Sequence, residues 1–234
     1  MKGLPPPSDT RSTRRTFDAE YSRYHDDPGY RARDSSAYDR LNVEDLWRRV
    51  RQVLSRLPGS PARVLEIGCS GGASLDRMRR ETAAPVVIGV DIRRSALATA
   101  REAAIGSTLI ETDCLPIPFR DGSFDVIFQF TTFSSIPETD AKVRIAREIL
   151  RVLATGGVFL WYDMRYPNPG NRFTRCETRA TIGHYFPGTD FHLESMTLIP
   201  QIGRWIYPSR PRLGGLLGRL AGLHSHYFGW FLKG

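Results

Sequence analysis

Short apolar runs alternate along the chain with longer stretches in which apolar residues recur every three or four positions. The short runs, such as Val86–Val90, have the length and β-branched content of buried strands, and the longer stretches are typical of amphipathic helices. Regular alternation of the two predicts a parallel sheet that is covered by helices on both faces. The expected elements are helix 43–57, strand 63–67, helix 72–81, strand 86–90, helix 95–104, strand 107–111, strand 125–130, helix 139–153 and strand 157–163.

The two ends of the chain depart from this alternation. Residues 1–16 combine prolines with Ser, Thr and Arg and are predicted to be disordered. Residues 17–40 are rich in Tyr, Asp and Arg, and we expect one or two short helices there. Helix 43–57 is predicted to begin after Asn42 and to stop at Pro58. The later part of the chain is expected to form a strand at 191–199, a helix at 212–223 and a strand at 226–233.

The first strand and the turn that follows it, Val-Leu-Glu-Ile-Gly-Cys-Ser-Gly-Gly at 64–72, carry the most information. Glycine tolerates positive φ and lets a ligand approach the backbone. Glu66 is unusual at a strand end, because an ionised carboxylate beside a core needs a partner. Asp91 closes the next strand, about twenty residues past the glycines, which is the arrangement of a nucleotide-binding unit whose acid binds ribose hydroxyls.

The spacing of the turn distinguishes between nucleotides. A dinucleotide fingerprint has glycine at its first, third and sixth places, and these places hold Gly68, Ser70 and Ala73. Glu66 would also repel a pyrophosphate, whereas it would attract a ligand that carries a positive charge. A Gly-rich turn is, taken alone, also compatible with tight packing and no ligand.

The turn resembles the acid-x-Gly-x-Gly-x-Gly signature of the class I S-adenosylmethionine-dependent methyltransferases, with Ser70 where the family usually has glycine. Residues 111–127 resemble the family's D-x-x-x-L-P-F-x-D-x-S-F-D region. Residues 151–160 resemble its R-V-L-K-P-G-G turn, with Thr155 in place of proline. The resemblance covers roughly residues 40–165, in the family's order and spacing.

This resemblance implies an α/β fold, a doubly wound, seven-stranded and mostly parallel sheet whose last strand is antiparallel and lies between the fifth and sixth. After the disordered tail, residues 17–234 would form a single domain. Its expected parts are an N-terminal cap or lid at 17–40, which includes Tyr21, Tyr24 and Tyr38, a cofactor-binding core at 41–165, and substrate-side elements at 166–234.

The resemblance also implies S-adenosylmethionine as cofactor and a set of residues around it. The turn would hold the methionine part, with Glu66 on its ammonium side, and Asp91 would accept hydrogen bonds from both ribose hydroxyls. Asp113 would face the adenine amine, although a turn role remains an alternative for Asp91 and for Asp113. The implied cofactor-binding residues are Glu66, Gly68, Ser70, Gly72, Asp91, Ile92, Asp113, Cys114 and Gln129.

Catalytic candidates follow from position. Methyl transfer needs alignment, desolvation and, for a hydroxyl acceptor, a base. Sites in open α/β sheets lie beyond the carboxyl ends of the strands. Asp163, His184 and His226 are candidates on this ground, with His224 nearby, and a structural role is the alternative for each. A polar cluster after the fifth strand is a candidate for binding the acceptor, and its members are Arg165, Asn168, Asn171 and Arg172.

We expect methyl transfer to a small-molecule acceptor, a hydroxyl of a glycan or secondary metabolite. The chain lacks an Asn-Pro-Pro-Tyr-type motif after the fourth strand, where it reads Gln129-Phe130-Thr131-Thr132, and this favours O- or C-methylation. Two alternatives stay open. One is methylation of a protein or an RNA, and the other is a non-catalytic subunit that binds S-adenosylmethionine.

Composition limits the other choices. The net charge is +8, and after Met164 nine basic residues stand against three acidic ones, which fits an anionic substrate or surface, or simply a solvated basic face. No basic stripe with interleaved aromatic residues indicates nucleic acid. Three cysteines without metal spacing predict reduced thiols, no metal and a cytoplasmic location. We expect neither a membrane span nor a signal peptide, and the oligomeric state is left open.

Overall fold

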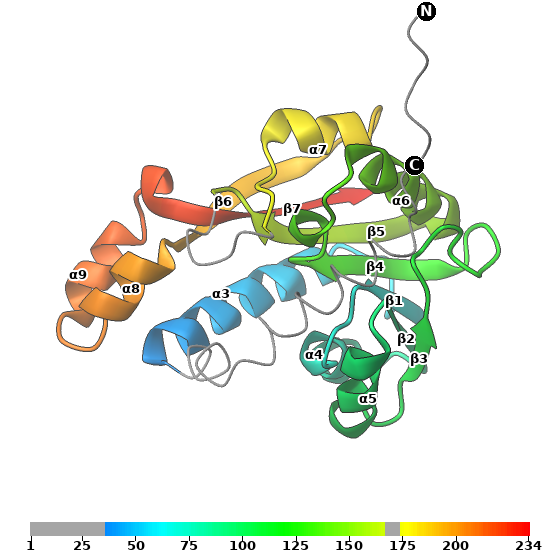
Figure 1. Ribbon diagram of the computed structural model, residues 1–234, viewed down its shortest axis with the longest axis horizontal. Coiled ribbons are helices and arrows are strands. Elements are labelled where there is room, and N and C mark those ends of the chain that lie inside the picture. Colours follow the sequence, from blue (N-terminus) through cyan, green and yellow to red (C-terminus); the bar gives the residue numbers. More distant parts are fainter. Residues whose placement is uncertain (1–35, 167–173) are drawn as a thin grey trace, which may run out of the picture.

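The computed structural model describes residues 36–166 and 174–234. Within them, seven strands form one sheet in the order β3-β2-β1-β4-β5-β7-β6 (Figure 1). Strands β1 to β5 are parallel, and β7 runs antiparallel between β5 and β6. The predicted fold class is confirmed. The strands are β1 (Arg63–Ile67), β2 (Val86–Asp91), β3 (Thr108–Glu111), β4 (Phe124–Phe130), β5 (Leu153–Met164), β6 (His192–Leu198) and β7 (His224–Leu232).

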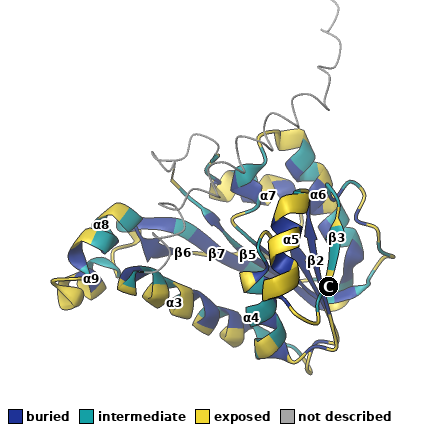
Figure 2. Cartoon of the chain, turned by 60° about the horizontal axis from the view of Figure 1, so that its bottom comes forward, coloured by how far each residue is buried: buried dark blue, intermediate teal, exposed yellow. Residues whose placement is uncertain are grey.

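Helices cover both faces of the sheet. One buried cluster joins α3, α4 and α5 to one face, and a second joins α6 and α7 to the other. Figure 2 shows the buried strands between these helical layers. The helices are α3 (Ala37–Leu54), α4 (Ala73–Thr82), α5 (Arg94–Ala103), α6 (Thr139–Val152), α7 (Arg179–Tyr185), α8 (Pro200–Ile206) and α9 (Pro211–Leu217), with the 3₁₀ turns η1 (Phe133–Ser135) and η2 (Ala221–Leu223).

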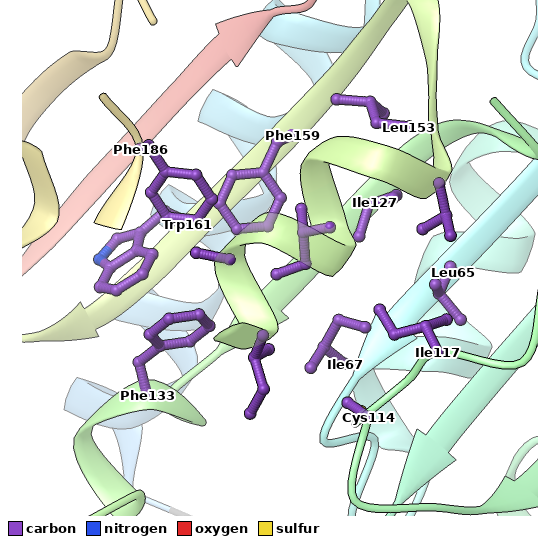
Figure 3. Packing of buried hydrophobic residues seen from close by; sticks show 14 of the residues in the cluster. Leu65, Ile67, Cys114, Ile117, Ile127, Phe133, Leu153, Phe159, Trp161 and Phe186 are labelled. Atoms are coloured by element: carbon purple, nitrogen blue, oxygen red, sulfur yellow. The ribbon is translucent and has the colours of Figure 1, made fainter. Parts of the chain in front are cut away.

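Strand β5 shows how the two faces are separated. Phe159 and Trp161 pack in the α6–α7 cluster, together with Phe133 and Phe186 (Figure 3). Leu160, between them, packs in the cluster of the opposite face. Successive side chains of a strand point to opposite faces. The residues that follow at the end of β5 are therefore divided between the two faces in the same way.

Some predicted boundaries are wrong. Helix α3 begins at Ala37 and not after Asn42, because the Ser36 hydroxyl caps it by accepting a bond from the Asp39 N–H at 3.1 Å. Asn42 lies inside the helix, and its amide donates to the carbonyl of Tyr38. The helix ends at Leu54, before Pro58.

The tail also differs from its prediction. The expected helix 212–223 is two pieces, because α9 ends at Leu217 with Gly218 as its C-cap and the chain then forms η2. Helices α7 and α8 were not expected, since seven residues are too few to show helical periodicity. Local signals mark both starts, a capping box at Thr178 and a proline at position 200.

The predicted lid overlaps the described residues only at 36–40. The predicted tail (1–16) and residues 17–35, with Tyr21 and Tyr24, lie outside them, so the lid stays a prediction there. Tyr38, in contrast, is buried in the first turn of α3, and its hydroxyl donates to the carbonyl of Leu198 at the end of β6. At this residue the segment is part of the packed core.

Tyr38 also fixes α8 against α3. A Cβ at Gly203 of α8 would lie 2.1 Å from Cε2 of the Tyr38 ring, so only glycine permits this approach. Beside this contact, Arg204 pairs with Asp39 at 2.9 Å. Helices α3 and α8 are therefore joined by a tight interface that consists of only a few side chains.

We predict that Gly203→Ala lowers the free energy of unfolding by about 1–3 kcal/mol, the usual cost of overpacking a filled site. Gly183→Ala is the matched control, because a Cβ at that helical glycine meets nothing within 4 Å. The control should leave stability unchanged or raise it by about 0.5–1 kcal/mol, since alanine favours helix over glycine. Urea unfolding of the two variants is the measurement, and equal stabilities would contradict the packing described here.

Candidate functional site

The turn from β1 to α4 depends on backbone conformations that glycine adopts readily. Gly68 and Gly72 have φ of +73° and +82°. The N–H of Gly68 donates to the carbonyl of Val90 at 2.8 Å, which ties the turn to β2. A Cβ at Gly68 would lie 2.3 Å from Oγ1 of Thr132, beyond β4. The close approach of the β1 and β4 ends thus requires glycine at this place.

Ser70 lies between these two glycines and is also left-handed, with φ +46°, at a place where the signature usually has glycine. Its backbone N–H donates to Oδ2 of Asp91 at 2.8 Å. Its hydroxyl accepts a bond of 2.9 Å from the guanidinium of Arg93. These two bonds hold a serine in a conformation that side chains seldom adopt.

Asp91 is nearly buried at the end of β2, and both of its oxygens are used. Oδ2 takes the Ser70 bond, and Oδ1 accepts from the N–H of Arg93 at 2.8 Å. The carboxylate therefore caps the next turn, the alternative that the sequence left open. This role does not exclude a ligand, since each carboxylate oxygen retains a further lone pair for a hydroxyl.

Glu66 lies on the same face of the sheet as Asp91 and is only 3% exposed. Its Oε2 has no hydrogen-bond partner within residues 36–166 and 174–234. Burial, and then the nearby Asp91 carboxylate, raise the pKa of Glu66 well above its ordinary value. A buried acid of this kind is stabilised in its ionised form when a cation comes near.

Gln129 lies near the end of β4 and is fully buried. Its Oε1 accepts bonds from the N–H groups of Thr132 and Phe133, at 2.9 and 3.4 Å. Its Nε2 has no partner in the part of the chain that the structure describes. Glu66 and Gln129 thus offer an orphaned acceptor and an orphaned donor on opposite faces, beside the gap between β1 and β4 where the strand order reverses.

These orphaned atoms fit the amino-acid end of S-adenosylmethionine. A carboxylate oxygen suits its ammonium group, and an amide N–H suits its carboxylate. Both atoms are enclosed, so their effect on a ligand passes through water or through the turn backbone. On this chemistry the residues present fit the cofactor that the sequence implies.

The positions implied for the adenine lie at the ends of β2 and β3, which are neighbours in the sheet. Ile92 is partly exposed there and offers an apolar side chain. Asp113 accepts a bond from the N–H of Leu115 at 3.0 Å, so its turn role is also present. The N–H of Cys114 donates to Oγ1 of Thr112 at 3.0 Å and is already used within the turn.

Asp163, at the end of β5, is completely buried on the α6–α7 face. Its Oδ2 accepts from the N–H of Ser134 at 3.1 Å, and its Oδ1 accepts from the N–H of Met164 at 2.7 Å. Burial raises the pKa of Asp163 to about 6, and these hydrogen bonds oppose the rise only in part. The carboxylate holds η1 against the end of β5.

His226, in β7, lies on the opposite face. Its ring stacks on that of Tyr162, with centroids 4.6 Å apart and planes 5° from parallel. Its Nδ1 is 2.8 Å from the hydroxyl of Ser225, which itself donates to the carbonyl of Thr197. Burial lowers the pKa of His226 to about 4, so the imidazole is neutral at neutral pH.

The structure does not bring the three catalytic candidates together. Asp163 and His226 are on different faces, and His184 is exposed on α7. The neighbouring His224 is buried between Oγ of Ser195 and the carbonyl of Gly218. Arg165 donates to the carbonyl of Ala221. The rest of the predicted acceptor cluster, Asn168, Asn171 and Arg172, lies outside the described residues.

A buried ion pair near Asp163 was missed in the sequence. Nζ of Lys142 in α6 is 2.5 Å from Oε1 of Glu177, and both side chains are buried. Glu177 also accepts a bond from the Thr181 hydroxyl at 2.9 Å. The pair fixes the chain after β5 to α6. No sequence signal connects the two residues of this pair, which are 35 positions apart. The contacts of Arg93 and Thr132 at the turn were missed as well, because neither residue occupies a recognised motif position.

Two negative findings concern the described residues. Within 36–166 and 174–234, no three His, Cys, Asp or Glu side chains gather where they would hold a metal ion. In the same part of the chain, every helix is too short or too polar to cross a bilayer.

Comparison with known proteins agrees with this geometry. Residues 65–161 match the methyltransferase domain family. This segment is a domain of the class I S-adenosylmethionine-dependent methyltransferases. The predicted family is thereby confirmed, and with it S-adenosylmethionine as the cofactor. The matched segment runs from within β1 to within β5, so it contains the turn, Asp91, Asp113 and Gln129.

Relatives of the chain differ in the acceptors they are named for. Phthiotriol/phenolphthiotriol dimycocerosates methyltransferase 1 of Mycobacterium ulcerans is 31% identical over 120 residues, 50% of this chain and 42% of that protein. Probable tRNA methyltransferase 9B of Mus musculus is 31% identical over 130 residues, 55% and 27% of the two chains. The chain spans less than half the length of these two curated relatives.

A solved structure resembles this chain in fold over most of its length. The N-methyltransferase NodS from Bradyrhizobium japonicum, in complex with S-adenosyl-L-homocysteine, superposes with a TM-score of 0.67 and 15% identity. The match covers 93% of this chain and 98% of that one. It includes the half of the sheet after β5, for which the sequence resembles the family in layout alone.

We predict that Asp91→Ala weakens binding of S-adenosyl-L-homocysteine by thirty- to a thousandfold, which corresponds to roughly 2–4 kcal/mol for lost charge-assisted bonds. Asp190→Ala, at an exposed residue of the same type, is the control. Calorimetry gives the two dissociation constants, and thermal melting checks that the fold survives. An unchanged constant in folded Asp91→Ala would refute the role of this carboxylate.

Proposed function

We propose that the chain transfers the methyl group of S-adenosylmethionine to a hydroxyl of a small-molecule acceptor, such as a glycan or secondary metabolite. The observation that carries the proposal is a neutral, half-buried imidazole, His226, stacked on Tyr162 at the carboxyl edge of the sheet. Names of relatives do not choose the acceptor, since they include a dimycocerosate and a tRNA. An anionic acceptor, which the basic C-terminal part would favour, stays a prediction.

When bound, S-adenosylmethionine supplies a methyl group that its sulfonium makes electrophilic. The chain's own residues then have to align the acceptor with the methyl group, enclose both and deprotonate the acceptor hydroxyl. The turn at 68–72 would hold the methionine part, and Asp91 the ribose through its remaining lone pairs. Glu66 would favour the ammonium, because a cation relieves the cost of its burial. A site that excludes water strengthens each of these interactions.

The hydrogen bonds of His226 define which ring nitrogen would act as a base. The single hydroxyl hydrogen of Ser225 goes to the carbonyl of Thr197, at 3.1 Å. The Ser225 oxygen can then only accept from His226, so Nδ1 carries the ring proton. Nε2 has the lone pair. With a pKa near 4, this nitrogen is deprotonated at neutral pH, and the stack on Tyr162 holds the ring plane.

Asp163 is the competing base, with a pKa raised to about 6. Both of its oxygens accept backbone bonds, from Ser134 and Met164. These bonds favour a role in positioning η1 at the end of β4. The pKa of Asp163 is nevertheless close to neutral pH, where general bases are effective. An experiment therefore has to separate the contribution of Asp163 from that of His226.

A pH profile of the rate of methyl transfer separates the two. A base must be deprotonated to act, so the rate rises with pH through the pKa of the base. If His226 is the base, we expect a flat rate above about pH 5 and a loss of about a hundredfold or more in His226→Gln, the usual contribution of a base. An inflection near pH 6 that disappears in Asp163→Asn would assign the role to Asp163. His192→Gln, at an exposed histidine, is the control.

The proposed function as a whole is tested by binding and turnover. Calorimetry should detect S-adenosylmethionine and S-adenosyl-L-homocysteine but not NAD, because Ser70 and Ala73 stand where a dinucleotide fingerprint has glycine. Release of S-adenosyl-L-homocysteine is then followed with hydroxylated small molecules, a peptide mixture and tRNA. Binding without release from any acceptor would favour a non-catalytic subunit. Turnover on tRNA or peptide alone would overturn the small-molecule proposal.

A further inference from the structure

A short helical hairpin stands apart from the sheet. It comprises α8, α9 and the residues up to 220, and it lies at one end of the molecule beside the start of α3 (Figure 1). Gly203 packs on the Tyr38 ring, and Gly214 of α9 packs on the ring of Tyr207, where a Cβ would lie 2.6 Å from Cε2. The hairpin is therefore anchored by its glycine-bearing side.

The outward side of the hairpin exposes large apolar side chains. Trp205 is 79% exposed, Leu216 58% and Leu220 51%. Trp205 follows Gly203 by two residues and Leu216 follows Gly214 by two, and at about 100° per residue each lies on the side of its helix away from the anchoring contact. Three large apolar groups on one small projection need a partner surface to be buried.

The charged side chains in this part of the chain are all positive. From Ser195 to Gly234 the sequence contains no acidic residue and five basic ones. Three of these, Arg210, Arg212 and Arg219, are exposed on the hairpin next to the apolar groups. Arg204, which pairs with Asp39, faces α3 instead. The partner that complements this surface is apolar and anionic.

The hairpin is connected to the edge of the sheet that carries the candidate site. Helix α8 follows the carboxyl end of β6 directly, and β7 starts at the same edge after η2. His226 lies in the first residues of β7. A surface that held the hairpin would therefore face the carboxyl edge of the sheet.

We propose that the α8–α9 hairpin docks the protein on the surface of an anionic lipid bilayer. Trp205 and the leucines enter the interface between headgroups and acyl chains, where tryptophan is favoured. The arginines meet the anionic headgroups, each adding to the attraction. Neither contribution alone gives stable binding, but apolar insertion and a basic patch together do. A second copy would bring like charges together at this surface, which disfavours a homodimer there.

Vesicle flotation of the full chain, without S-adenosylmethionine, tests the proposal independently of methyl transfer. We expect the protein to float with vesicles of phosphatidylcholine and phosphatidylglycerol and not with phosphatidylcholine alone. High salt should release it, because screening weakens the electrostatic part. Tryptophan emission should shift to the blue on the anionic vesicles, and this shift should be absent in Trp205→Phe.

Two double variants locate the surface. Trp205→Ser with Leu216→Ser removes the apolar part, and Arg210→Gln with Arg212→Gln removes two charges. We expect each to weaken vesicle binding by on the order of tenfold or more. Arg101→Gln with Arg120→Gln is the matched control for charge, and Ile105→Ser, at another exposed apolar residue, is the control for hydrophobicity. Both controls should bind as the unchanged chain does.

Several outcomes would overturn the proposal. One is absence of flotation with anionic vesicles by the unchanged protein. Another is equal binding by the hairpin variants and the controls, with thermal melting as the check that all are folded. A dimer in sedimentation that the Trp205 and Leu216 variant dissociates, without vesicle binding, would make the hairpin a contact between copies. A failure of methyl transfer would leave these results unaffected.

Discussion

The carboxylate of Asp91 is the point on which the arrangement of the candidate site depends. Two backbone N–H groups converge on it, one from the turn after β1 and one from the start of the turn after β2. The first of these fixes Ser70 in a left-handed conformation. The carboxylate thus holds together two loops that come from different strands, and it has lone pairs left for a ligand. The group that fixes the shape of the turn is thus the same one that we propose for binding the cofactor ribose.

The alternation of side chains along a strand explains why titratable groups that are close in sequence lie in different environments. Tyr162 and Asp163 are neighbours in β5 but point to opposite faces. The first stacks on a neutral histidine, and the second is a buried acid beside the Lys142–Glu177 pair. Burial lowers the pKa of His226 to about 4 and raises that of Asp163 to about 6, so the usual order of a histidine and an aspartate is reversed. Desolvation, the same physical cause, therefore disfavours charge on both faces.

Much of the fold was readable in the sequence because the parallel half of the sheet follows simple rules. Apolar runs, the Gly-rich turn and the order of motifs gave the strands from Arg63 to Met164 to within a few residues. The cofactor-binding residues that the resemblance implies lie in the same motifs, and their role stays a prediction. The second half was harder, since α7 and α8 are too short for periodicity and Gly218 divides the expected last helix. Contacts between distant residues, such as Lys142 with Glu177, leave no local pattern at all.

The contact between Tyr38 and Gly203 bears on where the structural unit begins. The hydrophobic pattern places the first core helix at 43, yet the six residues before it carry the Tyr38 ring that packs on Gly203 of α8 and the acid that pairs with Arg204. A chain trimmed to start at the patterned part of the helix would lose the Tyr38 ring that packs on Gly203 and the Asp39 carboxylate that pairs with Arg204. The end of β6 would also lose the hydroxyl bound to Leu198. The end of the edge strand β6 is thus bound by a residue that lies outside the recognised motifs and 160 positions away in the chain.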